Sequence, residues 1–297
     1  MTLAFEMKGA IGVFDSGVGG LTVVRTILQA VPNANVVFVA DQAHVPYGGR
    51  PLYEVAKFAQ GISEALIASG AAAVVMACNI STATALSAVV RSNPEHIVLG
   101  VIGPGARGAV SATKTGNIGV LATEGTVRTG EYTRCVHSIS SDVKVTEVAC
   151  PLFVPLIESG ETGTRQAFTA AAEYLDPILK SGADTVILGC THYPFLLECL
   201  QTVAPSVTFI DPACITALDL RDRLAARNSH EDLSTSNMTI MGNLVTTGDL
   251  QVFAAQVSRF IPEIHSRFKL GRGGWMHDKL VLSYDPISTA ERQAAVR

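Results

Sequence analysis

The sequence carries little charge and no strong excess of either sign. Asp and Glu number 26, and Lys and Arg number 22, which leaves a formal net charge of −4 at pH 7 on 297 residues. Proteins that bind duplex nucleic acid usually carry a basic patch or stripe, because they must neutralise phosphates. The near balance of charges therefore argues against a nucleic-acid partner.

Long hydrophobic runs are also missing, although 48% of the residues are hydrophobic. The apolar stretch worth testing as a membrane span, residues 65–78, is interrupted by Ser69 and Gly70 and is shorter than the ~18 residues that a span needs. The first residues, MTLAFEMKGA, do not join a basic start to an apolar stretch, so no secretory signal is visible. We expect no membrane partner and a cytoplasmic location.

Cysteine is scarce, with six residues in the chain and no Cys-x-x-Cys pair. A disulfide framework needs a higher density, and zinc or thioredoxin-like sites need the paired spacing. The Gly-x-Gly-x-x-Gly and Gly-Lys-Ser/Thr signatures of nucleotide-binding loops are absent from the first glycine-rich turn, DSGVGG. We therefore expect free thiols in a reducing compartment, no metal and no bound dinucleotide.

Short apolar segments alternate with helical patterns along most of the chain. Parallel strands that are buried on both faces read as continuous apolar runs separated by helices. The pattern predicts an α/β protein with doubly wound parallel sheets. The expected strands are residues 10–14, 35–40, 71–77, 98–102, 118–122, 143–148, 185–189 and 207–210.

The chain also repeats itself. A Ser-Gly-Ala triplet at Ser69 leads through an apolar strand to Cys78, and the same triplet at Ser181 leads at the same spacing to Cys190. An Ile-Gly-Val triplet opens each unit, and a strand followed by proline closes each. The repeat predicts two pseudo-symmetric domains with the active site in the cleft between them. We place the first at residues 1–104 plus 214–297 and the second at 105–213.

The C-terminal part is less regular. Residues 228–237 are polar and predict a loop, residues 238–242 predict a strand, and Thr247-Gly248-Asp249 can cap a helix over residues 250–260. We expect this segment to pack on the first domain. No assignment is made after Gly271.

Cys78 and Cys190 stand where chemistry is expected. Sites in open α/β sheets form at the carboxyl ends of strands, and each of these cysteines ends a strand where a helix is about to begin. Helix amides favour an anion there, which lowers the pKa of a thiol from ~8.5. The alternative interpretation is a small buried apolar residue, which suits Cys135 and Cys199 in expected helices, Cys150 before Pro151, and Cys214 in an expected turn.

Other polar residues follow the expected strands. The glycine-rich turn at Asp15-Ser16 can present amides to a carboxylate, while Asp15 can hold an ammonium group. Thr123 and Thr126 occupy the same position in the second unit. A capped helix or an ordinary turn would explain the same residues. The further candidates are Tyr47 and Gly48 in a Gly/Pro-rich loop, Asn79 after the first cysteine, Glu158 after an apolar run, and Thr191 and His192 after the second cysteine.

With these segments assembled, the chain resembles the glutamate racemase family of the wider aspartate/glutamate racemase superfamily. The resemblance covers roughly residues 11–260 and is carried by GVFDSGVGGLTV, VPYG, ACN, IGVLATEGTV, CPLFVPLIE, LGCTHYP and TTGD. It implies a racemase that works without a cofactor and has glutamate as its small-molecule substrate. It also implies a role in supplying D-glutamate for peptidoglycan. A homodimer is left open.

The resemblance implies a role for each matching residue. The catalytic set would be the two thiols Cys78 and Cys190, assisted by Asp15, Glu158 and His192. The thiols would act on opposite faces of the substrate's Cα. The substrate-binding set would be Asp15, Ser16, Tyr47, Gly48, Asn79, Ile80, Thr123, Thr126, Thr191 and His192.

One position departs from the family pattern, which usually has threonine where this chain has Ile80. The Ile80 amide can still donate, and Ser81 or Thr82 can replace the missing hydroxyl. Three alternatives stay open at this point. The first is an enzyme of the same superfamily that acts on another substrate, such as aspartate, a hydantoin or maleate. The second is a non-catalytic amino-acid-binding module. The third is a thiol hydrolase that uses Cys190 and His192.

Overall fold

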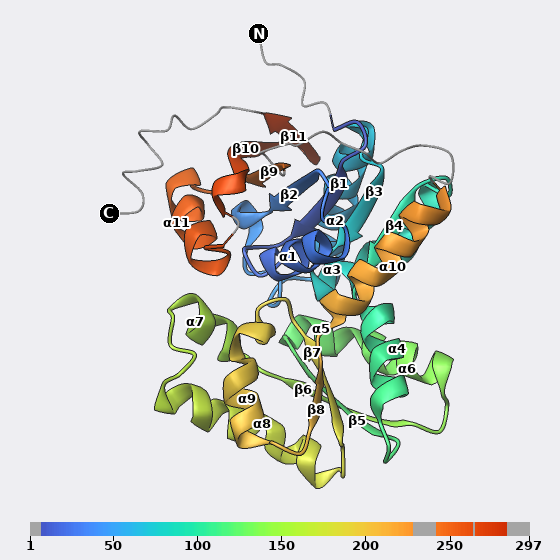
Figure 1. The fold of residues 1–297 in the computed structure, drawn as a ribbon, viewed down its shortest axis with the longest axis vertical. Coiled ribbons are helices and arrows are strands. Elements are labelled where there is room, and N and C mark those ends of the chain that lie inside the picture. The colour runs from blue at the N-terminus through green and yellow to red at the C-terminus, as the bar shows by residue number, and fades with distance from the viewer. Residues whose placement is uncertain (1–6, 228–241, 264, 284–297) are drawn as a thin grey trace.

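Two β-sheets form the frame of the molecule, and helices cover both (Figure 1). The computed structural model describes residues 7–227, 242–263 and 265–283. The strands of the first sheet are β1 (Ile11–Asp15), β2 (Val36–Ala40), β3 (Ala73–Met76), β4 (Ile97–Gly100), β9 (Gly242–Thr246), β10 (Phe268–Met276) and β11 (Lys279–Ser283). Those of the second are β5 (Asn117–Ala122), β6 (Lys144–Ala149), β7 (Thr185–Gly189) and β8 (Thr208–Ile210).

Helices connect these strands. Those up to the end of β5 are α1 (Leu21–Ala30), α2 (Leu52–Ala68), α3 (Asn79–Ser92) and α4 (Ile102–Ala112). Those after it are α5 (Glu124–Thr129), α6 (Glu131–Ile139), α7 (Phe153–Glu158), α8 (Arg165–Lys180), α9 (Leu197–Val203), α10 (Pro212–Arg227) and α11 (Leu250–Phe260). Short 3-10 turns η1 (Gln42–His44), η2 (Tyr193–Leu196) and η3 (His265–Arg267) complete the described elements.

The apolar strands are buried on both faces, as their composition predicts. In β2, Val36 and Phe38 belong to the core cluster on the α1 and α11 side, while Val37 and Val39 belong to the cluster on the α2 side. Successive side chains of a strand point to opposite faces, so an unbroken apolar run serves two cores at once. This arrangement is the doubly wound sheet that was expected.

The two sheets repeat one topology. The order β2-β1-β3-β4 lies within the first sheet, and the second sheet has the order β6-β5-β7-β8. All the strand pairs within these two sets are parallel. Since β5 follows β4 in the chain, the second sheet is the first motif used again, which confirms the pseudo-symmetric α/β fold. The domain boundaries at 1–104 plus 214–297 and 105–213 stay a prediction.

The C-terminal part differs from the expectation in two respects. Strand β9 runs over Gly242–Thr246 and shares only Gly242 with the strand expected at 238–242. Residues 238–241 lie outside the described part, together with the expected loop at 228–237. The chain then adds β10 beside β9, and β11 pairs with β10 in an antiparallel hairpin that the sequence did not reveal. Asp249 caps α11 as expected, its carboxylate accepting from the amides of Gln251 and Val252.

The start of α10 also differs from the expectation. Cys214 lies in the first turn of this helix rather than in a turn before it, because Pro212 already begins the helix. No helix in the described ranges is long and apolar enough to cross a membrane.

Candidate active site

Cys78 and Cys190 occupy equivalent places in the two sheets. Cys78 follows β3 and is the N-cap of α3, with an extended backbone, while Cys190 directly follows β7. Only 7% of Cys78 and 9% of Cys190 is exposed. The carboxyl ends of two corresponding strands therefore carry two buried free thiols.

Cys78 is held as a neutral thiol. Burial, together with the negative charge of Asp15, raises its pKa to about 12, although the hydroxyl and amide of Ser81 act in the lowering direction. Its Sγ lies 3.9 Å from the hydroxyl oxygen of Ser16. At neutral pH this group is therefore a proton donor.

Cys190 lies in a polar environment, at one end of a row formed by its own side chain and those of His192 and Glu158. Its Sγ lies 3.9 Å from Nδ1 of His192, and Nε2 of that ring lies 3.1 Å from Oε1 of Glu158. Burial alone would lower the pKa of His192, but Cys190 and Glu158 outweigh it and raise the pKa to about 10. The hydrogen bond from His192 in turn lowers the pKa of Glu158. A cationic imidazole therefore lies directly beside the sulfur of Cys190.

Asp15 joins the two domains at the end of β1. Its carboxylate accepts hydrogen bonds from the amide of Gly17 (2.9 Å), the hydroxyl of Ser16 (3.2 Å) and the hydroxyl of Thr191 (3.0 Å). Burial raises the pKa of Asp15, and these donors together with His192 lower it. Gly19 allows this contact, since a Cβ there would collide with the His192 ring and the Thr191 hydroxyl.

Two loops face each other on the other side of the site. A Cβ built on Gly48 would lie 3.6 Å from Cβ of Thr123, so the loop of the first domain backs on to the start of α5. Thr123 caps α5, and its Oγ1 lies 3.1 Å from Oγ1 of Thr126. The hydroxyl of Tyr47 points away to the buried Asp41, to which it donates at 2.6 Å. The Tyr47–Gly48 loop therefore offers its backbone toward the second domain.

The residues after Cys78 show which side chain can replace the threonine hydroxyl that is absent at Ile80. Ile80 packs in an apolar cluster with Tyr47 and Cys78, and a Cβ on Gly125 of the second domain would collide with it. Thr82 donates to the carbonyl of Met76 and is already used. The Ser81 hydroxyl is buried beside Cys78, whose pKa it lowers, and the described residues offer it no oxygen or nitrogen partner. Of the two possible replacements, the structure therefore leaves Ser81.

Asn79 is fixed from the second domain. Its Oδ1 accepts a hydrogen bond of 2.7 Å from the buried hydroxyl of Tyr132, which fixes the orientation of the side-chain amide. The structure thus brings Asp15, Ser16, Asn79, Thr191 and His192 together around the two cysteines.

Comparison with known proteins agrees with this geometry. The model of the Asp/Glu/hydantoin racemase family matches residues 11–219. This chain belongs to that family. A glutamate racemase from Desulforudis audaxviator is 40% identical over 258 residues, which cover 86% of this chain and 94% of the relative.

Solved structures of racemases share the fold. A glutamate racemase isoform from Bacillus anthracis matches with a TM-score of 0.81 and 32% identity, covering 92% of this chain and 100% of its own. A glutamate racemase from Francisella tularensis, solved in complex with D-glutamate, matches with a TM-score of 0.80 and 28% identity, covering 91% and 98%. The two-sheet arrangement is therefore that of the racemase family.

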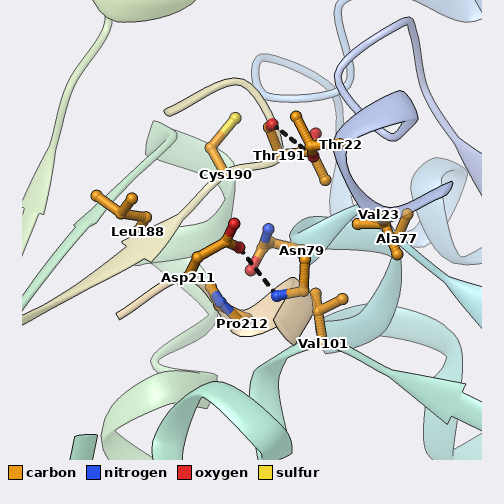
Figure 2. Close-up of a pocket in the computed structure, with 11 residues that line it drawn as sticks. Thr22, Val23, Ala77, Asn79, Val101, Leu188, Cys190, Thr191, Asp211 and Pro212 are labelled. Atoms are coloured by element: carbon orange, nitrogen blue, oxygen red, sulfur yellow. Dashed lines mark hydrogen bonds between the residues drawn. The ribbon is translucent and has the colours of Figure 1, made fainter. Parts of the chain in front are cut away.

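A small pocket of this racemase lies between its two domains (Figure 2). Cys190 and Asn79 both line it, and the hydroxyl of Thr22 donates across it to the carbonyl of Thr191 at 3.1 Å. At its other end the carboxylate of Asp211 accepts from the amide of Ala213. In the part of the chain that is described, no cluster of His, Cys, Asp and Glu is arranged to hold a metal ion.

Four residues of this region were not proposed as site residues from the sequence. Asp41 directly follows β2, so the strand-end rule that selected Asp15 could have found it. Ser81 was weighed only as a substitute for another hydroxyl. Tyr132 lies within α6, and Asp211 follows β8. The sequence gives no sign that the hydroxyl of Tyr132, a residue within a helix, donates to Asn79 in the other domain.

Proposed function

We propose that this racemase interconverts L- and D-glutamate by a two-thiol mechanism that needs no cofactor. Racemisation removes the Cα proton from one face of the amino acid and returns a proton to the other face. Two acid/base groups on opposite sides of one carbon are therefore required. The observation that carries the proposal is the pair of buried thiols, Cys78 and Cys190, at corresponding strand ends of two repeated sheets.

The two thiols start in different protonation states. We assign the starting thiolate to Cys190, which lies beside cationic His192, and the starting thiol to Cys78, whose pKa of about 12 keeps it protonated. The Cys190 thiolate takes the Cα proton, and the Cys78 thiol gives its proton to the opposite face. Cys190 is then a thiol and Cys78 a thiolate, which is the state that accepts the other enantiomer. Both half-reactions use the same two groups in reverse.

The remaining residues hold the substrate and its developing charge. Asp15 receives the ammonium group, helped by Ser16 and Thr191. The backbone amides of Asn79 and Ile80 donate to one carboxylate. The backbone amides of Tyr47 and Gly48, together with the hydroxyls of Thr123 and Thr126, provide the second set of donors. Preorganised donors in a water-excluded site stabilise a carbanion without reorganisation, and removing one such donor costs on the order of 10²–10³ in rate.

Three further points belong to the proposal. The substrate is glutamate because relatives that cover most of this chain are glutamate racemases, and a structural neighbour was solved with D-glutamate. The D-glutamate formed supplies peptidoglycan. The enzyme works in the cytoplasm, and its assembly as a monomer or homodimer is a separate question.

Isotope exchange tests the proposal. The pure protein is incubated under reducing conditions with L-glutamate in D₂O, without pyridoxal phosphate. NMR follows α-deuterium and circular dichroism follows optical activity. The proposal predicts exchange together with decay of the dichroic signal to zero. Exchange with aspartate but not glutamate would move the substrate to another acid of the family, and silence with all acids would reject the racemase mechanism.

A further inference from the structure

Asp41 is a fully buried carboxylate that gathers side chains from distant parts of the chain. Its Oδ2 accepts from the hydroxyl of Tyr47 at 2.6 Å and lies 2.8 Å from Nδ1 of His44. Its Oδ1 accepts from the hydroxyl of Thr247 at 2.8 Å and from the indole Nε1 of Trp275 at 2.7 Å. A buried carboxylate is tolerated only when such donors surround it. Asp41 is thus the common partner of the Tyr47–Gly48 loop and of the C-terminal hairpin.

Trp275 is seated for this contact. It is the single tryptophan of the chain and lies in β10, in the hairpin that the sequence did not predict. Its ring lies against α2 at Gly61, where an added Cβ would come within 3.1 Å of the indole. Glycine weakens a helix interior, so its presence in α2 is accounted for by the ring that needs the space. The indole also contacts His44 and Phe58, with ring centroids 5.2 and 5.8 Å away.

The same aromatic group holds the loop from its other side. The His44 ring stacks on Phe58 with centroids 3.9 Å apart, and the Tyr47 ring lies 5.8 Å from Phe58. The Arg50 guanidinium sits over Phe58, and its Nε donates to the carbonyl of His44 at 2.6 Å. The loop therefore has a rigid support on the hairpin side, while Gly48 faces Thr123 across the domain boundary.

We propose that Trp275 is a positioning residue for the substrate-binding loop, acting through the Asp41 carboxylate on Tyr47 and Gly48. The hairpin that supplies it lies beyond residues 11–219, the part that matches the family model. The inference rests on the proposed function in one respect, since it takes the backbone of Tyr47 and Gly48 to contact the substrate. Trp275 itself has no chemical role in the reaction.

Trp275→Phe is the decisive substitution, because it keeps an aromatic side chain at this position and removes the indole N–H that donates to Asp41. We expect KM for glutamate to rise by roughly tenfold with kcat changed by less than about twofold, since a lost hydrogen bond to a charged group weakens binding to this degree. Met276→Ala is the matched control: it lies next to Trp275 in the same hairpin and is 63% exposed. It should keep the parent KM. A residue that only stabilised the fold would lower the melting temperature and leave KM unchanged.

A second readout does not depend on the substrate. Hydrogen exchange of the backbone amides, measured without ligand, should become faster in residues 42–50 of Trp275→Phe and stay unchanged in β7. Asp41→Asn should raise KM in the same way, and Trp275→Phe should add little to it, because both changes break one network.

The outcomes separate the two proposals. If the parent protein does not racemise glutamate, the proposed function fails, and the exchange measurement still tests the loop. The positioning role would be overturned if amide hydrogen exchange in residues 42–50 were unchanged in Trp275→Phe. It would also be overturned if the KM increase of the double variant equalled the product of the increases in Trp275→Phe and Asp41→Asn. Faster exchange in those residues together with non-additive KM effects is the result we expect.

Discussion

Thr191→Val removes one donor from Asp15 while keeping the shape of the side chain. The Thr191 hydroxyl donates to Oδ2 of Asp15 at 3.0 Å, and both residues are buried. A hydrogen bond to a charged group contributes about 1.5–3 kcal/mol. In the proposed mechanism only the ionised Asp15 holds the substrate ammonium, so kcat/KM should fall by about tenfold to a hundredfold.

The pH dependence separates this effect from a direct contact between Thr191 and substrate. Burial raises the pKa of Asp15, and the Thr191 hydroxyl is one of the groups that lower it. Without the hydroxyl the pKa rises further, and ionised Asp15 is lost at a higher pH. The acidic limb of the kcat/KM profile should therefore move to higher pH in Thr191→Val.

Racemisation rates measured by circular dichroism across the acidic range supply the assay, and Thr191→Ser is the control that retains the hydroxyl. The serine variant should keep the parent profile. An acidic limb that stays in place in Thr191→Val, or that moves to lower pH, would refute the role given to this hydrogen bond.

Three further predictions concern Ser81, Ile80 and His192. Ser81→Ala should slow alkylation of Cys78 at fixed alkaline pH, because the hydroxyl lowers the pKa of that thiol. Mass spectrometry of the Cys78 peptide measures the rate, which Ser81→Thr should restore and which would contradict the prediction if it were unchanged in Ser81→Ala. Ile80→Thr should lower the free energy of unfolding by about 1–2 kcal/mol in urea, because a hydroxyl enters an apolar cluster; a more stable variant would show that Ile80 is misplaced. The free energy of unfolding should fall as pH rises from 6.5 to about 10, since folded His192 keeps its proton over that range and the unfolded chain does not. In thermal melts, His192→Gln should make the melting temperature less dependent on pH. An equally strong pH dependence in that variant would argue against a raised pKa of His192.

The strand-end rule predicts that the two cysteines and Asp15 lie at the carboxyl ends of strands, and the structure has them there, because the rule depends only on apolar runs and the residues at their ends. Apolar runs identify β1, β3 and β7 without any knowledge of partners, and the carboxyl ends of parallel strands lie at one edge of a sheet. The repeat then paired Cys78 with Cys190. These features are local in sequence, which is why the sequence was sufficient.

The C-terminal hairpin could not be predicted in the same way. Strand β10 reads FKLGRGGWM, with three glycines and two basic residues, so it lacks the apolar run of an interior strand. Its strand conformation comes from pairing with β9, which is a tertiary contact. The hydrogen bond from Trp275 to Asp41 is therefore invisible in the sequence, although the place of Asp41 after β2 is not.

Side-chain direction at the start of α3 was also beyond the sequence. Ile80 points to Gly125 of the second domain, and Ser81 stays near Cys78. Which of two adjacent residues faces a thiol depends on how the second domain packs, and hydrophobic periodicity carries no information about that.

The central claim is that two protein thiols act on one substrate carbon. The direct measurement is α-deuterium incorporation and loss of optical activity in D₂O, starting from each glutamate enantiomer, for Cys78→Ala and Cys190→Ala beside the parent. Cys199→Ala is the matched control, a buried thiol in α9 with no place in the proposed site. We predict that both site variants fold but lose racemisation of both enantiomers, while Cys199→Ala keeps it. Racemisation at the parent rate by either Cys78→Ala or Cys190→Ala would contradict the two-thiol mechanism.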